Sequence, residues 1–258
     1  MRNLTFARAI LAAEWTKIRT VPSTAWTLGL TCVLSPGLGI LVALSLRADI
    51  DRVVNFDPVF AGLYPLTIGQ LALVAFGVLL VGSEYSSGTI RASLAAVPRR
   101  GAFFGGKVLA GASVALGVSV ITVIVTFAAA QAALGPHATT FGADGVPPAI
   151  VGACVYLTLI CVFSMGVAML LRSSAVSLGI LLPLLFLGSQ GLGNIPALKP
   201  VLQYFPDQAG MVLMRAVSTQ GDPRFGHDYG PWGALAILVA WTAAALACGH
   251  LALSRRDA

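Results

Sequence analysis

Charged residues are scarce in this chain of 258 residues: Lys, Arg, Asp and Glu make up 10% of it, against about 25% in soluble domains. Hydrophobic residues make up 57%, and the mean hydropathy is +0.87. The 28 Gly and 14 Pro fit this composition, because transmembrane helices tolerate both residues. The scarcity of charge therefore excludes most soluble proteins and predicts a membrane protein.

Motifs of the common metal sites and membrane enzymes are also missing. No HExxH, GxSxG or pair of intramembrane aspartates occurs, which argues against an intramembrane protease. His227 and Asp228 adjoin in a polar loop, where such a pair is typical of solvated side chains rather than of a metal site. The cysteines form no Cys-x-x-Cys pair, so we expect neither a disulfide framework nor zinc. All four lie within apolar runs: Cys32, Cys154, Cys161 and Cys248.

One stretch partly matches the sequence motif of a phosphate-binding loop. Gly101, Gly106 and Lys107 match GxxxxGK, but Val108 stands where that loop needs Ser or Thr to bind magnesium. No strand is predicted before it, and a membrane span follows. We therefore expect no nucleotide or other cofactor on this chain, and we expect Lys107 to anchor a span end at the membrane interface.

Six apolar runs are long enough to cross about 30 Å of hydrocarbon. They cover residues 24–46, 59–82, 108–134, 148–171, 175–194 and 232–253. Only residues 172–174 separate the fourth run from the fifth, which predicts a tight helical hairpin. Pro36, Pro65 and Pro183 are expected to bend their spans. The predicted fold class is all-α: a polytopic membrane protein with six transmembrane helices in a single domain over residues 1–258.

Lys and Arg are unevenly distributed between the two sides of these spans. The side with both chain ends and the loop over residues 83–107 carries eleven of the sixteen, and the other side carries five. The positive-inside rule therefore places both termini in the cytoplasm, with the chain in the plasma (inner) membrane. In a membrane protein the net charge of +6 reports orientation rather than nucleic-acid binding. We expect the first span to be a signal anchor, because it is too long for a cleaved leader.

The segment before the first span, residues 1–22, predicts a helix on the cytoplasmic membrane surface, although an ordinary basic flank stays possible. Its apolar residues recur three or four positions apart: Leu4, Ala7, Leu11, Trp15 and Ile18. The charged residues face elsewhere: Arg8, Glu14, Lys17 and Arg19.

The loop over residues 83–107 predicts a short amphipathic helix. Gly88 breaks the preceding span, Thr89 caps the new helix and Pro98 ends it. One face is apolar: Ile90, Leu94 and Val97. A helix this short is not stable alone, so its apolar face must be covered either by a partner protein or by the chain's own bundle.

Glu84 is the acidic residue at the end of the second span. A carboxylate at the bilayer centre would cost roughly 2.5–3.5 kcal/mol, whereas the end of a span is far less demanding. We expect Glu84 to pair with an Arg of the loop; the alternative is a carboxylate solvated at the interface.

The outer segment over residues 195–231 is predicted to form an extracellular hairpin. Its apolar run, residues 209–217, follows Pro206 and precedes the turn over residues 221–223. The run is too short to cross a bilayer, so a re-entrant or interfacial helix is expected.

Three segments resemble the permease subunit of bacterial ABC-type exporters of the type-2 class. They are AEWTKIRTVPSTAW, GSEYSSGTIRASLAAVPRRGAFFGGK and QYFPDQAG, at residues 13–26, 82–107 and 203–210. The resemblance implies that the loop after the second span holds a coupling helix that docks on an ATPase subunit. Glu84 resembles the family's acidic residue at the cytoplasmic end of the second span. Gly88, Thr89 and Arg91 resemble the start of the coupling helix, and its end is matched by Pro98, Arg99, Arg100 and Lys107.

The resemblance also implies a mode of action. Two copies of the chain, or one copy and a similar permease, would form a path through the membrane lipid. Two ATPase subunits with ATP and Mg would drive it, so that this chain hydrolyses nothing itself. An integral membrane enzyme and a non-transporting membrane scaffold stay as alternatives.

The spans themselves predict the class of cargo. No Asp, Glu, Lys or Arg lies near a midplane, which weighs against a proton- or sodium-driven carrier and suits a hydrophobic or amphipathic compound such as a drug, antibiotic or lipid. In the resembled family, spans two and five face the partner permease, which makes Gln70 and Gln190 candidates for the pathway. The alternative for each is a hydrogen bond between helices, worth about 0.6 kcal/mol.

Overall fold

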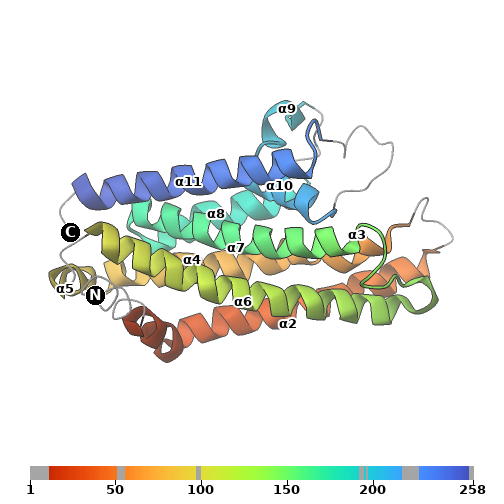
Figure 1. Cartoon of the computed structure of the whole chain (residues 1–258), viewed down its shortest axis with the longest axis horizontal. Coiled ribbons are helices and arrows are strands. Elements are labelled where there is room, and N and C mark those ends of the chain that lie inside the picture. Colours follow the sequence, from red (N-terminus) through yellow and green to blue (C-terminus); the bar gives the residue numbers. More distant parts are fainter. Residues whose placement is uncertain are drawn as a thin grey trace.

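The computed structural model describes residues 12–50, 56–96, 100–191, 195, 197–216 and 227–255. Helices account for most of these residues, and no strand occurs among them. Long helices run side by side along the molecule, with short helices at either end (Figure 1). This arrangement confirms the predicted all-α, polytopic architecture.

Five stretches are long and apolar enough to cross a membrane. They contain α2 (Pro22–Ala48), α3 with α4 (Pro58–Leu63 and Leu66–Ser86), α6 with the short η2 (Arg100–Leu134 and Gly135–His137), α7 (Val146–Leu171) and α11 (Pro231–Arg255). The fifth predicted run corresponds to α8 (Ser174–Gln190), which has 17 residues and ends before residue 194. At 1.5 Å per residue it extends about 26 Å, so the count of six spans stays a prediction.

Two of the predicted spans differ in detail from the helices. The second is divided by Pro65 into α3 and α4, because proline has no backbone N–H for a continuous helix. The third begins at Arg100, eight residues earlier than predicted, since the apolar face of α6 extends back through Phe103 and Phe104, which are buried. Pro36 and Pro183 remain inside α2 and α8.

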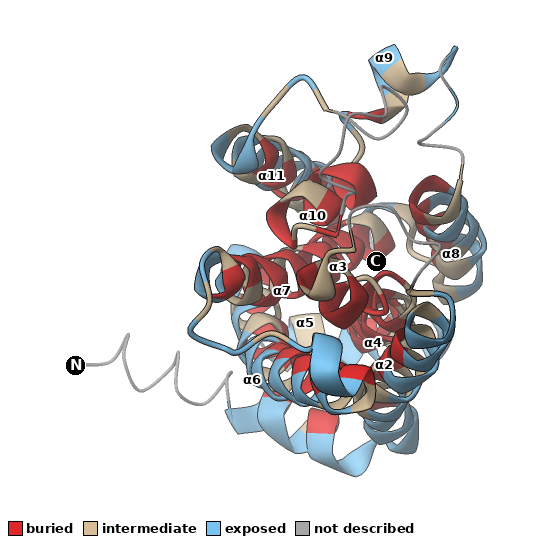
Figure 2. Ribbon diagram, turned by 90° about the vertical axis from the view of Figure 1, so that its right-hand side faces the viewer, coloured by how far each residue is buried: buried red, intermediate tan, exposed pale blue. Residues whose placement is uncertain are grey.

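Helices α4 and α7 form the centre of the bundle. In the second and fourth spanning stretches 72% and 61% of the residues are buried, against 22–33% in the other three. Figure 2 shows α2, α6, α8 and α11 arranged around this pair with their exposed sides outward. The central helices pack closely at Gly77, where a Cβ atom would lie 2.2 Å from Ser164 Oγ and 2.6 Å from the carbonyl oxygen of Cys161.

The loop between α7 and α8 is a tight hairpin. Arg172 adopts a left-handed conformation with φ of 57°, and Ser173 Oγ accepts a hydrogen bond from the Val176 amide at 3.3 Å, which caps α8. The Arg172 guanidinium donates to the carbonyl oxygen of Ala252 at 2.8 Å. A basic group at the carbonyl end of α11 interacts favourably with the helix dipole, and the hydrogen bond joins the hairpin to α11.

The outer segment contains α9 (Lys199–Leu202) and α10 (Pro206–Leu213). Helix α10 begins three residues before the predicted apolar run and ends within it. It packs against α7, α8 and α11, and nearly all of its side chains are buried. This burial favours a re-entrant position over an interfacial one.

Candidate functional site

The N-terminal helix (residues 12–20) is the described part of the predicted surface helix; residues 1–11 lie outside the described residues. One face of this helix packs against the bundle. Glu14 and Ile18, one turn apart, are 2% and 6% exposed, whereas Trp15 is 50% exposed. A carboxylate occupies the buried face because two lysines there neutralise it.

Four charged side chains meet where this helix crosses α4 and α6. Lys107 Nζ lies 2.7 Å from Glu14 Oε2 and 2.9 Å from Glu84 Oε1. Lys17 Nζ lies 2.9 Å from Glu14 Oε1 and 2.7 Å from Glu84 Oε1. Each lysine therefore contacts both glutamates. We call Glu14, Lys17, Glu84 and Lys107 the four-charge ring.

The ring is buried and carries no net charge. The side chains of Lys107, Glu14 and Glu84 are 1%, 3% and 8% exposed, and that of Lys17 is 41% exposed. Lys107 also lies 3.4 Å from the carbonyl oxygen of Leu80, so all three of its donors have acceptors. Buried charges persist only when they are paired in this way.

The ring also sets the acid–base properties of the N-terminal helix. Burial by itself would raise the pKa of Glu14, but the ammonium groups of Lys107 and Lys17 outweigh it and lower that pKa below its ordinary 4.5. Burial would lower the pKa of Lys17, but the carboxylates of Glu84 and Glu14 raise it above 10.5. Both residues are therefore held in their charged forms at neutral pH.

Two expectations about these residues were wrong. Glu84 pairs with Lys17 and Lys107 rather than with an Arg of the loop. Lys107 is buried in the bundle rather than anchored at an interface. The sequence did contain a signal: Lys107 occupies a helical position in line with Phe103, Ala110 and Gly111, which are all buried, so its charge falls within an apolar stripe.

A cavity of about 340 Å³ adjoins the ring. The ends of α4, the N-terminal helix and α5 (Ile90–Ala96) enclose it, with Lys17, Ser83, Glu84 and Ser93 among its lining residues. Glu84 Oε2 is buried and has no hydrogen-bond partner among the residues that the structure describes. A residue of the cavity wall thus carries an oxygen that can accept one more hydrogen bond.

Helix α5 is the predicted amphipathic helix. Ile90 is 4% exposed and belongs to the main hydrophobic core, and Leu94 packs against that core, so the chain's own bundle covers these two residues of the apolar face. Val97 lies outside the described residues. Gly88 has φ of +71°, and the carbonyl oxygen of Thr89 accepts the first helical hydrogen bond, from the Ser93 amide. The exposed face consists of Arg91, Ala92 and Ala95.

The far end of the predicted coupling segment is only partly described. Pro98 and Arg99 lie outside the described residues. Arg100 begins α6 and donates to the carbonyl oxygens of Leu253 and Ser254, at 2.7 and 3.2 Å. Through this contact the start of α6 is fixed to the end of α11.

The chain matches the sequence profile of the ABC-2 family transporter proteins over residues 36–258. It belongs to the ABC-2 transporter family. A comparison with curated proteins gives no match. The family consists of the membrane components of ABC transporters, so the chain is a multi-pass permease subunit whose family pairs with an ABC ATPase subunit. Glu84 and Lys107 lie within the matched residues, whereas Glu14 and Lys17 precede them.

The two pathway candidates of this ABC-2 permease both bond to neighbouring helices. Gln70 is 1% exposed, donates to the carbonyl oxygen of Thr67 at 2.8 Å and accepts from the Tyr156 hydroxyl. Gln190 accepts from the Tyr64 hydroxyl at 3.0 Å and donates to Thr67 Oγ1 at 3.2 Å. Gln70 therefore offers no surface to a second chain, and a pathway role for either residue stays a prediction.

Neither of the other two motifs forms a site in the permease. Gly101, Gly106 and Lys107 all lie in α6 rather than in a loop; the backbone amides of Gly106 and Lys107 are engaged in the helix, and the Lys107 side chain is engaged in the ring. Asp228 accepts from Gln203 Nε2 at 2.6 Å, and His227 contacts Gln208 Oε1 at 3.3 Å. No group of three or more His, Cys, Asp or Glu that could hold a metal ion occurs within the described ranges.

Proposed function

We propose that this permease works in an ATP-driven exporter of hydrophobic or amphipathic compounds, such as drugs, antibiotics or lipids. Two copies of the chain, or one copy and a homologous permease, form the pathway in the plasma (inner) membrane. Two copies of an ABC ATPase subunit, which bind ATP and Mg, dock at the end of the bundle that carries α5. That end faces the cytoplasm, and the chain itself hydrolyses no ATP.

The observation that carries this proposal is the position of the four-charge ring beside α5. Helix α4 ends at Ser86, and only three residues separate it from α5, whose Ile90 is buried in the core. A force on α5 therefore displaces the end of α4 that carries Glu84. Because Glu84 is bonded to Lys17 and Lys107, the displacement reaches the N-terminal helix and α6 together.

The docking face follows from what the bundle leaves uncovered. Ile90 and Leu94 are engaged, so an ATPase subunit would contact the exposed Arg91, Ala92 and Ala95. Small alanine side chains allow close approach, and Arg91 favours an acidic partner surface. The coupling roles proposed for Glu84, Gly88, Thr89 and Arg100 belong to the same end of the bundle, and those of Pro98 and Arg99 stay predictions.

The orientation is supported by where the charged segments lie. The N-terminal helix, α5 and the end of α11 are together at one end of the bundle, and α3, α9 and α10 are at the other (Figure 1). The first end corresponds to the side that carries eleven of the sixteen Lys and Arg. The positive-inside rule then makes it cytoplasmic.

Co-purification tests the docking face. The full-length permease is expressed with its ATPase subunit, and Ala95→Trp is compared with Ala132→Trp, which also replaces an exposed helical alanine but lies near the other end of α6. We expect Ala95→Trp to lose most of the bound ATPase and Ala132→Trp to retain it. Equal retention by both variants would reject α5 as the docking helix.

Cysteine labelling in whole cells tests the orientation. In a variant without native cysteines, Ser87→Cys beside α5 and Thr140→Cys at the opposite end are both exposed. We expect an impermeant maleimide to label Thr140→Cys from outside and Ser87→Cys only after permeabilisation. The reverse pattern would invert the topology and remove the ATPase from the α5 end.

A further inference from the structure

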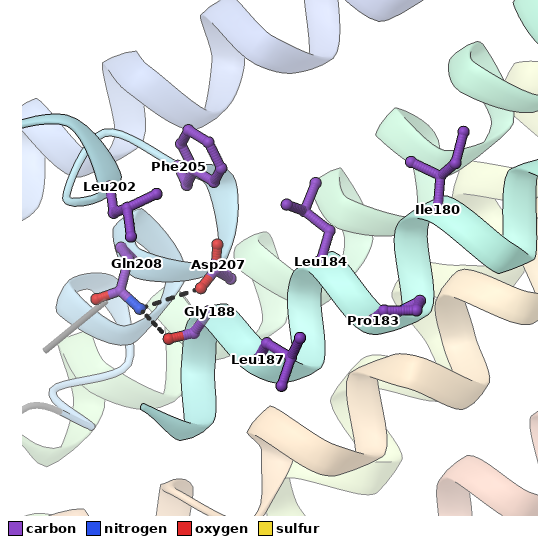
Figure 3. Close-up of a pocket in the computed structure, with 9 residues that line it drawn as sticks. All are labelled: Ile180, Pro183, Leu184, Leu187, Gly188, Leu202, Phe205, Asp207 and Gln208. Carbon is purple, nitrogen blue, oxygen red and sulfur yellow. Dashed lines mark hydrogen bonds between the residues drawn. The ribbon is translucent and has the colours of Figure 1, made fainter. Parts of the chain in front are cut away.

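A second cavity, of about 290 Å³, lies between α8 and the segment that contains α9 and α10 (Figure 3). Its walls are apolar: Ile180, Pro183, Leu184 and Leu187 from α8, and Leu202 and Phe205 from the other side. Asp207 and Gln208, at the start of α10, supply the polar side chains of the lining. The cavity thus has an apolar wall and an acidic residue at one end, and its volume is at the lower limit of small-molecule sites.

Asp207 has a carboxylate oxygen without a partner. The residue is 0% exposed, and its Oδ2 accepts from Gln208 Nε2 at 3.0 Å. Its Oδ1 has no hydrogen-bond partner within the described part of the chain. In Figure 3 the oxygen that is not joined to Gln208 lies on the side of Phe205 and Leu184. A buried carboxylate oxygen is costly to leave unpaired, so Oδ1 is poised to accept a hydrogen bond from a bound ligand.

The charge state of Asp207 favours a cationic donor. Helix α10 is not one of the spanning helices, and burial raises the pKa of Asp207 from 3.8 to about 6. The carboxyl is therefore mainly ionised at pH 7.5. The groups that hydrogen-bond the carboxyl and partly offset the effect of burial on its pKa are neutral: the Gln208 side chain and the backbone amides of Asp207 and Gln208. The Gln208 side chain also donates to the carbonyl oxygen of Gly188 at 2.8 Å.

Glycine at position 188 makes room for this carboxylate. A Cβ atom there would lie 2.3 Å from Asp207 Oδ2 and 3.0 Å from Oδ1. Any larger residue on α8 would push the side chain of Asp207 out of its place. The close approach of α8 and α10 therefore depends on one residue without a side chain.

The cavity is reached from the outer surface of α8. Ile180, Leu184 and Leu187 are exposed on this helix of the single chain, and its apolar composition suits contact with hydrocarbon or with a partner permease. Because Asp207 has no contact with solvent, a ligand meets it only after a neighbouring side chain of the lining turns aside. An apolar chain lying along α8 fits this route better than a water-soluble ligand does.

We propose that the cavity binds an amphipathic amine, with its ammonium group on Asp207 Oδ1 and its alkyl chain along α8. Neutral amphiphiles of the same length bind weakly, because they leave the carboxylate unpaired. Aminophospholipids and free cationic amphiphiles share this chemistry. That the bound amine is cargo rests on the transport function proposed above, whereas the binding itself does not.

Titration calorimetry on the purified full-length chain in phosphatidylcholine nanodiscs tests the binding at pH 7.5. Dodecylamine is compared with dodecanol, and empty nanodiscs give the contribution of lipid partition. We expect saturable binding of dodecylamine, weakened about tenfold or more by Asp207→Asn, and weak binding of dodecanol to both proteins. Equal affinity of the folded wild type and Asp207→Asn for dodecylamine would overturn the proposal.

A second pair of variants leaves Asp207 unchanged. Leu184→Trp fills the mouth of the cavity, and Phe186→Trp places the same bulk on an exposed residue of α8 outside the lining. We expect only Leu184→Trp to abolish dodecylamine binding; its persistence there would also overturn the proposal. Nanodiscs with phosphatidylethanolamine distinguish the sources: competition supports a lipid ligand, and Asp207-dependent binding without competition supports a free amphiphile. No ATPase is needed, so this result is separate from the docking test.

Discussion

Lys107 Nζ lies 2.9 Å from Glu84 Oε1 inside the bundle, with the lysine side chain 1% exposed. The two residues flank α5 in the sequence, one at the end of α4 and one near the start of α6. Their contact therefore closes the loop that carries α5. Glu14 and Lys17 complete the ring from a segment that precedes the first spanning helix.

Removing the buried lysine should destabilise the protein strongly. Lys107→Met leaves Glu14 and Glu84 close together in the interior with one exposed partner, and breaking a buried pair costs about 3–5 kcal/mol. Lys17→Met should cost less, because 41% of that side chain is exposed. Thermal unfolding in detergent measures both variants, and an equal loss would show that the ring is not buried in solution.

Neutralising Glu84 should impair coupling. Glu84→Gln removes the negative charge that both lysines share and leaves only a neutral amide oxygen as acceptor, so motion of α5 is passed less firmly to the N-terminal helix and α6. We expect lower ATP-dependent uptake of a labelled amphiphile by inside-out vesicles, at matched amounts of assembled complex. Unchanged uptake would count against the ring as a coupling element.

Acid should weaken the ring through Glu14. Because the folded-state pKa of Glu14 lies below 4.5, its contribution to stability is fully present above pH 4.5. The contribution is lost as the pH falls below 4.5 through the folded-state pKa, since the unfolded chain binds the proton first. Unfolding temperatures of wild type and Glu14→Gln should therefore converge on acidification. A constant difference between them down to pH 3 would contradict this.

Asp207→Asn should make the protein more stable at pH 7.5. The folded-state pKa of about 6 exceeds the ordinary 3.8, so folding loses stability as the pH rises from 3.8 through 6. A shift of this size corresponds to about 3 kcal/mol. Thermal unfolding at pH 7.5 and pH 3.5 tests this prediction. The unfolding temperature of the variant should exceed that of wild type at pH 7.5. An increase of the same size at pH 3.5 would exclude the ionised carboxylate as the cause.

Gly77→Ala should separate the two central helices. Its Cβ would lie 2.6 Å from a backbone carbonyl of α7, which cannot rotate aside, so we expect a loss of about 1–3 kcal/mol. Gly117→Ala is the control, because nothing lies within 4 Å of its Cβ position. Denaturant unfolding of the control should show an unchanged or slightly higher free energy of unfolding. If both variants lost a similar free energy of unfolding, close packing at Gly77 would not be the cause.

Much of the fold could be predicted because lipid imposes a simple rule on sequence. A run of about 20 apolar residues must form a helix to satisfy its backbone in hydrocarbon, so the spans were found by length alone. The break at Pro65 was expected only as a bend. The start of α5 was also predictable, from Gly88 and Thr89, whereas its predicted end at Pro98 lies outside the described residues.

The candidate site was harder to predict, because it joins distant segments. Glu84 was recognised as a carboxylate in need of a partner, yet the partner was sought within its own loop. Lys17 lies 67 residues away, and no local pattern connects the two. Gln70 lies on α4 at the centre of the bundle, and its pathway role stays a prediction because it depends on how two permeases assemble.

The sequence by itself determined the membrane class, the helical fold, the family and the amphipathic helix after the second span, since composition and spacing carry these properties along the chain. Only the tertiary structure decided which charges neutralise one another and which carboxylate oxygens stay unpaired. Pairing energies in a low-dielectric interior depend on distances of a few ångströms between residues far apart in sequence. Such distances are set by helix packing, and the packing depends on small residues such as Gly77 and Gly188 that carry no chemical signal of their own.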